Sequence, residues 1–250
     1  MAQEDNWDAY MAQYPKGPGS TLVNLSAKNS APDKNLKFVL ITGVTFKDCV
    51  DGLPAKEEFD KLYVISDSVK SIVDKLKVNK SVGTFTYQCQ RLDYYYLADT
   101  SGLRGQLIEL YKKYIPAYVP YINIKTDNNW EAYLTFLYPN EDILDHMQNE
   151  KVVIQLKNAG DDGKKERQVD HWLYFATESD RKCMFGFLGE AKFIVESLDK
   201  TDYTGYPYSL HISRVDKADI NSISRVTKAL RAQVKKCNGV YDGWESPVEK

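Results

Sequence analysis

Few side chains of this sequence have the types and spacing that catalysis or metal binding requires. The histidines are His146, His171 and His211, and they do not show the spacing of metal ligands. The sequence also lacks the G-x-S-x-G nucleophile motif, the phosphate-binding P-loop and the dinucleotide-binding G-x-G-x-x-G motif. We therefore expect no catalytic residue, no metal site and no cofactor.

One set of acidic and aromatic residues in the second half could still form a site. Its members are Asp161, Asp162, Asp170, His171, Trp172, Tyr241, Asp242 and Trp244. A histidine flanked by carboxylates can act as a general base or a metal ligand, provided that the residues converge in the fold. A structural role is the favoured alternative, in which the aspartates solvate a loop, His171 opens a strand and Trp244 packs over a sheet edge. We treat the set as possible partner-binding residues.

Composition argues against several classes of partner. The formal net charge of −2 gives no field that nucleic acid or an anionic membrane would feel. No run approaches the ~18 apolar residues of a membrane span, and the first residues do not have the pattern of a signal peptide. The cysteines are far apart in sequence, which we interpret as single thiols in a reducing compartment, with Cys183 in the core. We expect a cytoplasmic protein.

Two further patterns could serve binding. The predicted helix over 219–237 carries a basic stripe, but the sequence has no segment resembling the aromatic motif of sheet-based RNA modules, so a solvated helix face is the favoured interpretation. The run Tyr94-Tyr95-Tyr96 lies on a predicted strand, and strand alternation predicts that at least one of the three rings faces outward.

Hydrophobic periodicity then gives the elements of the first half. Residues up to Pro18 are polar and predict a loop, followed by a short strand over 21–25. A β-rich run over 37–46, two strand-like runs over 82–97 and a strand over 118–124 alternate with helical patterns. The helices are predicted over 57–77 and 103–115, so the order is β-α-β-β-α-β. The segment 130–138 is predicted to be extended.

The second half repeats this order. An amphipathic helix over 141–158 precedes strands at 171–176, 191–198, 206–215 and 239–241, with helices at 178–189 and 219–237. We therefore predict the α+β class, with two tandem ferredoxin-like (βαββαβ) domains over 1–140 and 141–250.

The end of the chain carries a resemblance to a known family. The closing segment Tyr241-Asp242-Gly243-Trp244-Glu245 and the strand Val169-Asp170-His171-Trp172-Leu173-Tyr174-Phe175 are similar to the regulator of ribonuclease E activity B family, over about 100 residues. The first domain resembles a bacterial family of unknown function that is often fused to it, through Trp7-x-x-Tyr10 and Trp130-x-x-Tyr133. The regulator family implies direct binding to an endoribonuclease, without chemistry on RNA.

The leading hypothesis is a bacterial, non-catalytic regulatory protein that binds another protein, either an endoribonuclease or another RNA-processing factor. The alternatives are a small-molecule-binding module with a pocket at the domain junction, and a hydrolase that uses His171 with Asp162 or Asp170. The last two rest on fold analogy and on a convergence of side chains that the sequence does not fix.

Overall fold

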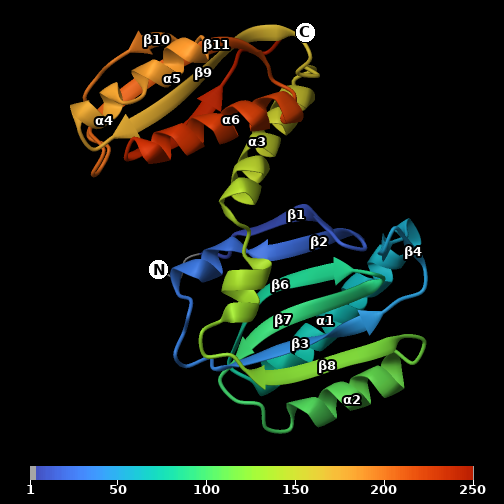
Figure 1. The fold of residues 1–250 in the computed structure, drawn as a ribbon. Helices are drawn as coiled ribbons and strands as arrows, with labels where there is room; N and C mark the ends of the chain where they lie inside the picture. The colour runs from blue at the N-terminus through green and yellow to red at the C-terminus, as the bar shows by residue number, and fades with distance from the viewer. Residues whose placement is uncertain (1–3, 250) are drawn as a thin grey trace. The chain divides into compact units, whose positions relative to one another are not determined.

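The computed structural model describes residues 4–249, and the chain divides into two compact units, Met1–Pro139 and Asn140–Lys250. Both units combine helices with antiparallel sheets, so the predicted α+β class is confirmed. Figure 1 shows the order of the elements along the chain.

A six-stranded antiparallel sheet forms the first unit, with the strand order β1-β2-β6-β7-β3-β8. Its strands are β1 (Trp7–Tyr14), β2 (Gly17–Asn24), β3 (Phe38–Thr45), β6 (Asn79–Tyr87), β7 (Gln90–Leu97) and β8 (Val119–Thr126), beside the small pair β4 (Cys49–Val50) and β5 (Leu53–Pro54). Its helices are α1 (Phe59–Leu76) and α2 (Leu103–Tyr114), with short helical turns at Leu25–Asn29, Lys56–Glu58 and Ala132–Leu137.

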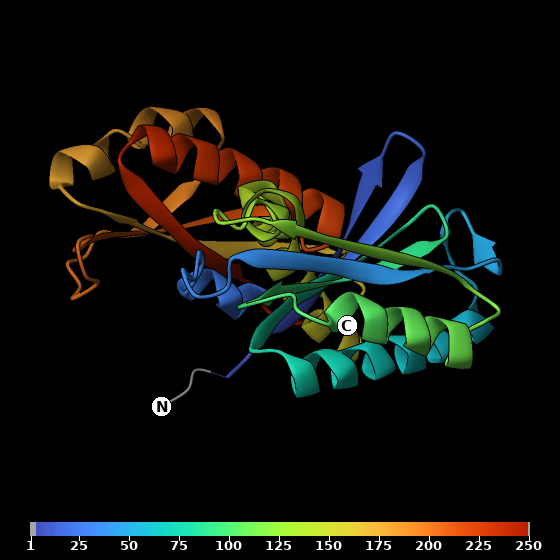
Figure 2. The same cartoon turned by 90° about the horizontal axis from the view of Figure 1, so that it is seen from below.

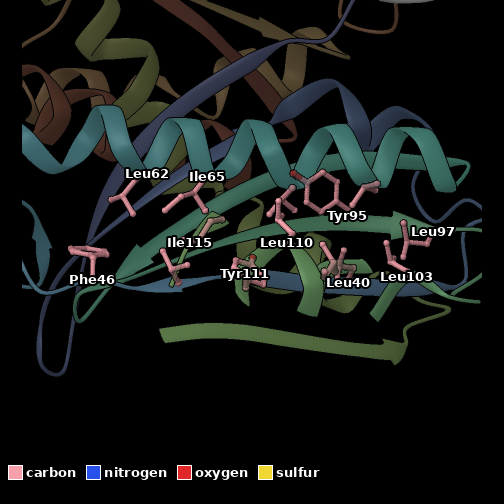
Figure 3. Packing of buried hydrophobic residues seen from close by; sticks show 14 residues of the cluster. Leu40, Phe46, Leu62, Ile65, Tyr95, Leu97, Leu103, Leu110, Tyr111 and Ile115 are labelled. Atoms are coloured by element: carbon pink, nitrogen blue, oxygen red, sulfur yellow. The ribbon is translucent and has the colours of Figure 1, made fainter. Parts of the chain in front are cut away.

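The helices α1 and α2 lie side by side along one side of this sheet (Figure 2). Leu62 and Ile65 of α1 point toward the sheet above Phe46 and Ile115 (Figure 3). Leu40 and Tyr95 of the strands and Leu107 of α2 belong to the same buried cluster. Burial of each such side chain contributes roughly 1.5–3 kcal/mol. The apolar spacing that predicted both helices is therefore the spacing of their buried faces.

The amino-terminal segment corrects the predicted loop, because Trp7–Tyr14 forms strand β1 and pairs with β2. Pro15 and Lys16 are the tip of this hairpin rather than the end of a loop. The segment is polar because only Tyr10 of β1 is buried, and an edge strand needs little apolar surface.

The segment predicted to be extended over 130–138 is instead a helical turn, Ala132–Leu137. The Asp127 carboxylate accepts hydrogen bonds from the backbone N–H groups of Glu131 (2.9 Å) and Ala132 (3.0 Å), as a helix cap does. Trp130, Tyr133 and Leu137 are fully buried at helical spacing.

This turn also explains why the prediction for the three tyrosines was wrong, since Tyr94, Tyr95 and Tyr96 are all buried. Tyr95 packs among the helices, whereas Tyr96 stacks on Trp130 with ring centroids 3.9 Å apart. The sheet is covered on both sides at this point.

A four-stranded antiparallel sheet forms the second unit, with the order β10-β11-β9-β12. Its strands are β9 (Glu166–Phe175), β10 (Ile194–Ser197), β11 (Tyr208–Lys217) and β12 (Gly239–Glu245), and its helices are α3 (Glu141–Asn158), α4 (Glu178–Lys182), α5 (Phe185–Glu190) and α6 (Ile220–Lys236). The single helix predicted over 178–189 is thus two short ones. Leu173 and Phe175 of β9 share a buried cluster with Met184, Leu188 and α6.

Most basic side chains of the α6 stripe are exposed, as the interpretation of a solvated helix face predicted, and some of them also form ion pairs with α3. Lys228 lies 2.6 Å from Asp142, and Arg231 lies 3.0 Å from Asp145, whose carboxyl is nearly buried. The acidic first turns of α3 thus lie against the basic side of α6, and part of the basic stripe forms ion pairs within the second unit.

The cysteines are also paired, contrary to the expectation of single thiols. Cys49 is bonded to Cys89 in the first unit, and Cys183 to Cys237 in the second. Each pair is separated by 40 residues or more in the sequence, so only the tertiary fold brings the two members together. Cys183 is exposed rather than part of the core.

Candidate functional site

Strand β9 carries most of the candidate residues, and its alternation divides them between two faces of the sheet. Val169, His171 and Leu173 point to the helix side and are buried. Asp170, Trp172 and Tyr174 point to the opposite side and are partly exposed. The set predicted from the sequence is therefore not one cluster.

His171 belongs to the packed side. It is fully buried, its Nδ1 shares a 2.8 Å hydrogen bond with the Tyr241 hydroxyl, and its ring meets the edge of Phe193. Burial, helped by the nearby Arg214 charge, lowers the pKa of His171 to about 3. The neutral ring is paired with a phenol and not with Asp162 or Asp170, so the geometry of the hydrolase alternative is absent here.

Trp244 is the cross-strand neighbour of His171 and is likewise buried. Its indole Nε1 donates to the Asn149 side chain of α3 at 2.8 Å, and Asn149 donates to Thr227 of α6 at 2.9 Å. Trp244 thereby ties β12 to both long helices, which is a structural role.

The three remaining aspartates differ from each other in their surroundings. Asp161 forms a buried ion pair with Arg167 and accepts backbone hydrogen bonds from Gly163 and Glu249, both at 2.8 Å. The Arg167 hydrogen bond holds the pKa of Asp161 far below its usual range. Asp162 is exposed beside Lys164, and Asp242 is exposed at the irregular step of β12.

The other side of the sheet, here called the outer face, has an ordered polar and aromatic surface. It is defined by Asp170, Trp172, Tyr174, Glu196, Tyr203, His211, Ser213 and Glu245. His211 of β11 lies directly opposite Trp172, and their rings stack with centroids 4.7 Å apart and an angle of 8°. The His211 Nε2 donates to Asp170 at 2.8 Å, and Gln168 donates to the same carboxylate at 3.1 Å. These contacts fix the orientation of all three site side chains.

A second aromatic pair extends this surface. Tyr174 stacks on Tyr203 of the loop before β11, with centroids 4.4 Å apart. On the β10 side, the Ser213 hydroxyl donates to Glu196 at 2.5 Å. Stacked rings with fixed polar groups can bind a partner by stacking and by hydrogen bonds.

Sequence reasoning found Asp170 and Trp172 but missed His211, Tyr203 and Glu196. The alternation of β9 already separates Asp170 and Trp172 from His171, so this division was available from the sequence. The partners on β10 and β11 depend on the strand register, for which the sequence gives no local signal.

Across residues 4–249, no group of three or more His, Cys, Asp or Glu side chains is placed to hold a metal ion. Within the same range, no helix is both long enough and apolar enough to cross a membrane.

Comparison with known families assigns both halves of the chain. The model of the Family of unknown function (DUF695) matches residues 5–138, which is more than half of the sequence. The chain belongs to that family. Its second half, residues 146–246, matches the model of the family Regulator of ribonuclease activity B. The resemblance seen in the sequence is thus confirmed for both parts of this DUF695 family member, and residues 146–246 contain the whole outer face.

Two solved structures show a weak similarity. An unknown protein from Galdieria sulphuraria is 8% identical, with a TM-score of 0.22, and covers 85% of this chain and 99% of its own. A protein described as a "putative glycine cleavage system transcriptional repressor" is 9% identical, with a TM-score of 0.23, and covers 84% and 98%. Both TM-scores are too low to support a conclusion. No curated protein matches the sequence.

Proposed function

We propose that the chain is a non-catalytic regulator that binds a ribonuclease, or another protein of RNA processing, through the outer face of its second unit. The observation that carries this proposal is the fixed constellation of Asp170, Trp172 and His211 on one sheet face, within the part of the chain that matches regulators of ribonuclease activity. A partly exposed tryptophan held by its neighbours is typical of the anchor residues of protein interfaces.

Catalysis has little support in the same unit. His171 is buried and neutral, and the His211 imidazole is engaged between a carboxylate and an indole ring. A general base must reach the proton that it removes, and an activated nucleophile must lie within hydrogen-bonding distance of that base. Among the described residues, the ring of His171 is hydrogen-bonded to a phenol and that of His211 to a carboxylate, and no serine, threonine or cysteine side chain is hydrogen-bonded to either.

We further propose that each unit is a ferredoxin-like fold and that the protein acts in the cytoplasm. The fold proposal is supported by the element order β-α-β-β-α-β and by the strand orders β6-β7-β3-β8 and β10-β11-β9-β12, which place the first and third strands of each run in the centre. The proposal for the cytoplasm is supported by the regulator family, whereas the two disulfides favour an oxidising compartment.

The test measures the cleavage rate of a labelled RNA by an endoribonuclease purified from the same organism, with the full-length protein added in increasing amounts. We expect the wild type to change the rate and the double variant Trp172→Ala/Tyr174→Ala to have a much smaller effect. The control Phe185→Ala removes an aromatic ring of 40% exposure from α5 and should behave as the wild type.

Binding of the enzyme to each variant is measured in parallel by affinity capture. An unchanged rate together with no binding by the wild type, for each ribonuclease of the organism, would refute the proposal. Equal binding by the wild type and by the Trp172→Ala/Tyr174→Ala variant would refute the outer face as the contact surface.

A further inference from the structure

We infer that the outer face recognises a cationic, arginine-bearing segment of its protein partner. This inference rests on the proposed function and adds the chemistry of the partner. Its basis is the placement of carboxylates beside stacked aromatic rings on one side of the sheet.

The outer face carries three carboxylates close to the row of paired residues through Asp170. Asp170 of β9 has Glu245 of β12 as its cross-strand neighbour on one side and Ser213 of β11 on the other. Ser213 in turn holds Glu196 of β10 by its hydroxyl. Asp170 and Glu245 therefore face each other on neighbouring strands, with Glu196 bonded beside them from the irregular step of β10. Like charges on opposite strands repel each other. A cation bound over this row would relieve the repulsion.

The aromatic rings form the next rows of the same face. Trp172 lies directly beside the row of Asp170, one outward position further along β9, with His211 stacked on it. Tyr174 and Tyr203 follow, stacked on each other. A cation above an indole or phenol ring is attracted by the ring electrons.

The edge next to Trp172 is open. Gly243 of β12 is the cross-strand neighbour of Trp172, and a Cβ atom at Gly243 would meet no atom within 4 Å. A side chain of the partner can therefore approach the indole from this edge without displacing protein atoms.

Arginine fits this surface better than lysine does. Its planar guanidinium can stack on a ring and donate in parallel to a carboxylate, whereas the lysine ammonium is a strongly hydrated point charge. An acidic peptide or RNA would place negative charge against Asp170, Glu196 and Glu245 and is disfavoured on the same grounds.

Fluorescence anisotropy of labelled peptides with the full-length protein tests the inference. The probes are a ten-residue Gly/Ser peptide with four arginines, the same peptide with four lysines, the same peptide with four glutamates, and a labelled oligouridylate. We expect the arginine peptide to bind most tightly and the glutamate peptide and the RNA to bind least. Added salt should weaken the binding of the arginine peptide.

The charge variant Asp170→Asn/Glu196→Gln keeps the size of both side chains and should weaken arginine-peptide binding by about threefold to tenfold, as the loss of two partly exposed ion pairs predicts. The control Glu190→Gln removes an exposed carboxylate from α5 and should leave binding unchanged. Circular dichroism and the melting temperature verify that each variant folds.

Preference for the glutamate peptide or the RNA, or equal arginine-peptide binding by the charge variant and the wild type, would overturn the inference. Such a result would leave the proposed function standing if the ribonuclease still bound in a manner dependent on Trp172 and Tyr174. If neither the arginine peptide nor the ribonuclease binds in the expected manner, the inference and the proposed function are both refuted.

Discussion

Replacement of Cys183 and Cys237 by serine should destabilise the second unit by about 4 kcal/mol. The two cysteines are 54 residues apart, and closing a loop of this length removes conformational entropy from the unfolded chain worth roughly that amount at 25 °C. At an m-value of about 2 kcal/mol/M, the urea midpoint should fall by roughly 2 M. The exposed position of Cys183 makes its replacement mild for packing, whereas Cys237 is buried.

Urea titration followed by circular dichroism gives the midpoint, and hydrogen exchange read by mass spectrometry assigns each transition to residues 1–139 or 140–250. The matched variant Cys49→Ser/Cys89→Ser opens a loop of 40 residues in the first unit and should lower that unit's stability by a similar ~4 kcal/mol. Reducing agent should move the wild type to the midpoints of the two variants.

The reasoning fails if thiol titration of the unreduced, unfolded wild type finds four free thiols. It also fails if the disulfide is present and its removal leaves the midpoint of the second unit unchanged. The same titration on protein taken directly from cells bears on location, because stable disulfides are rare in a reducing cytosol. Four free thiols there would agree with a cytoplasmic protein.

Two predictions concern buried ionisable groups. Burial lowers the pKa of His171 to about 3, so below pH 6.5 the unfolded chain binds a proton that the folded chain does not bind. The free energy of unfolding should therefore decrease by up to about 1.4 kcal/mol per pH unit as the pH falls from 6.5. His171→Gln should remove this part of the slope in urea titrations between pH 7 and 4, and equal slopes would contradict the assignment. Asp161→Asn leaves the Arg167 charge buried without its partner and should cost about 3–5 kcal/mol at pH 7. A loss below about 1 kcal/mol, measured by the same urea titration, would show that the pair is not buried in solution.

Local periodicity allowed much of the fold to be predicted. The helix over 141–158 has the predicted bounds, with Asn140 accepting the Ile143 N–H at its start. The helix over 103–114 ends shortly before Pro116, as expected because proline cannot continue a helix. In both helices the signal is carried by residues close in sequence.

The errors have a common cause in contacts between distant residues. Trp130 stacks on Tyr96, and its indole donates to the Leu36 carbonyl at 2.9 Å. The two disulfides likewise join separate elements. Contacts between distant residues leave no pattern in the local sequence. For this reason the sequence predicted neither strand β1 nor the burial of Tyr94, Tyr95 and Tyr96.

The candidate site shows the same limit at the level of single side chains. The placement of its β9 residues follows from strand alternation alone, since Asp170 and Trp172 must lie on the face opposite to that of His171. Which side chain of β11 meets Trp172 depends on the register, and a shift of one residue would bring a side chain from the other face in place of His211.

Folding alone does not explain the composition of the outer face. The core of the second unit needs only the inward residues of β9, yet the outward positions hold a tryptophan and a tyrosine, and Asp170 faces Glu245 across the strands. Partly exposed rings and opposed carboxylates are both unfavourable in the isolated protein. The bond from His211 to Asp170 and the stack on Trp172 hold these side chains in place, which reduces the entropy lost when a partner binds. A surface that is costly when free and already ordered for binding is expected where function, rather than stability, determines the residues.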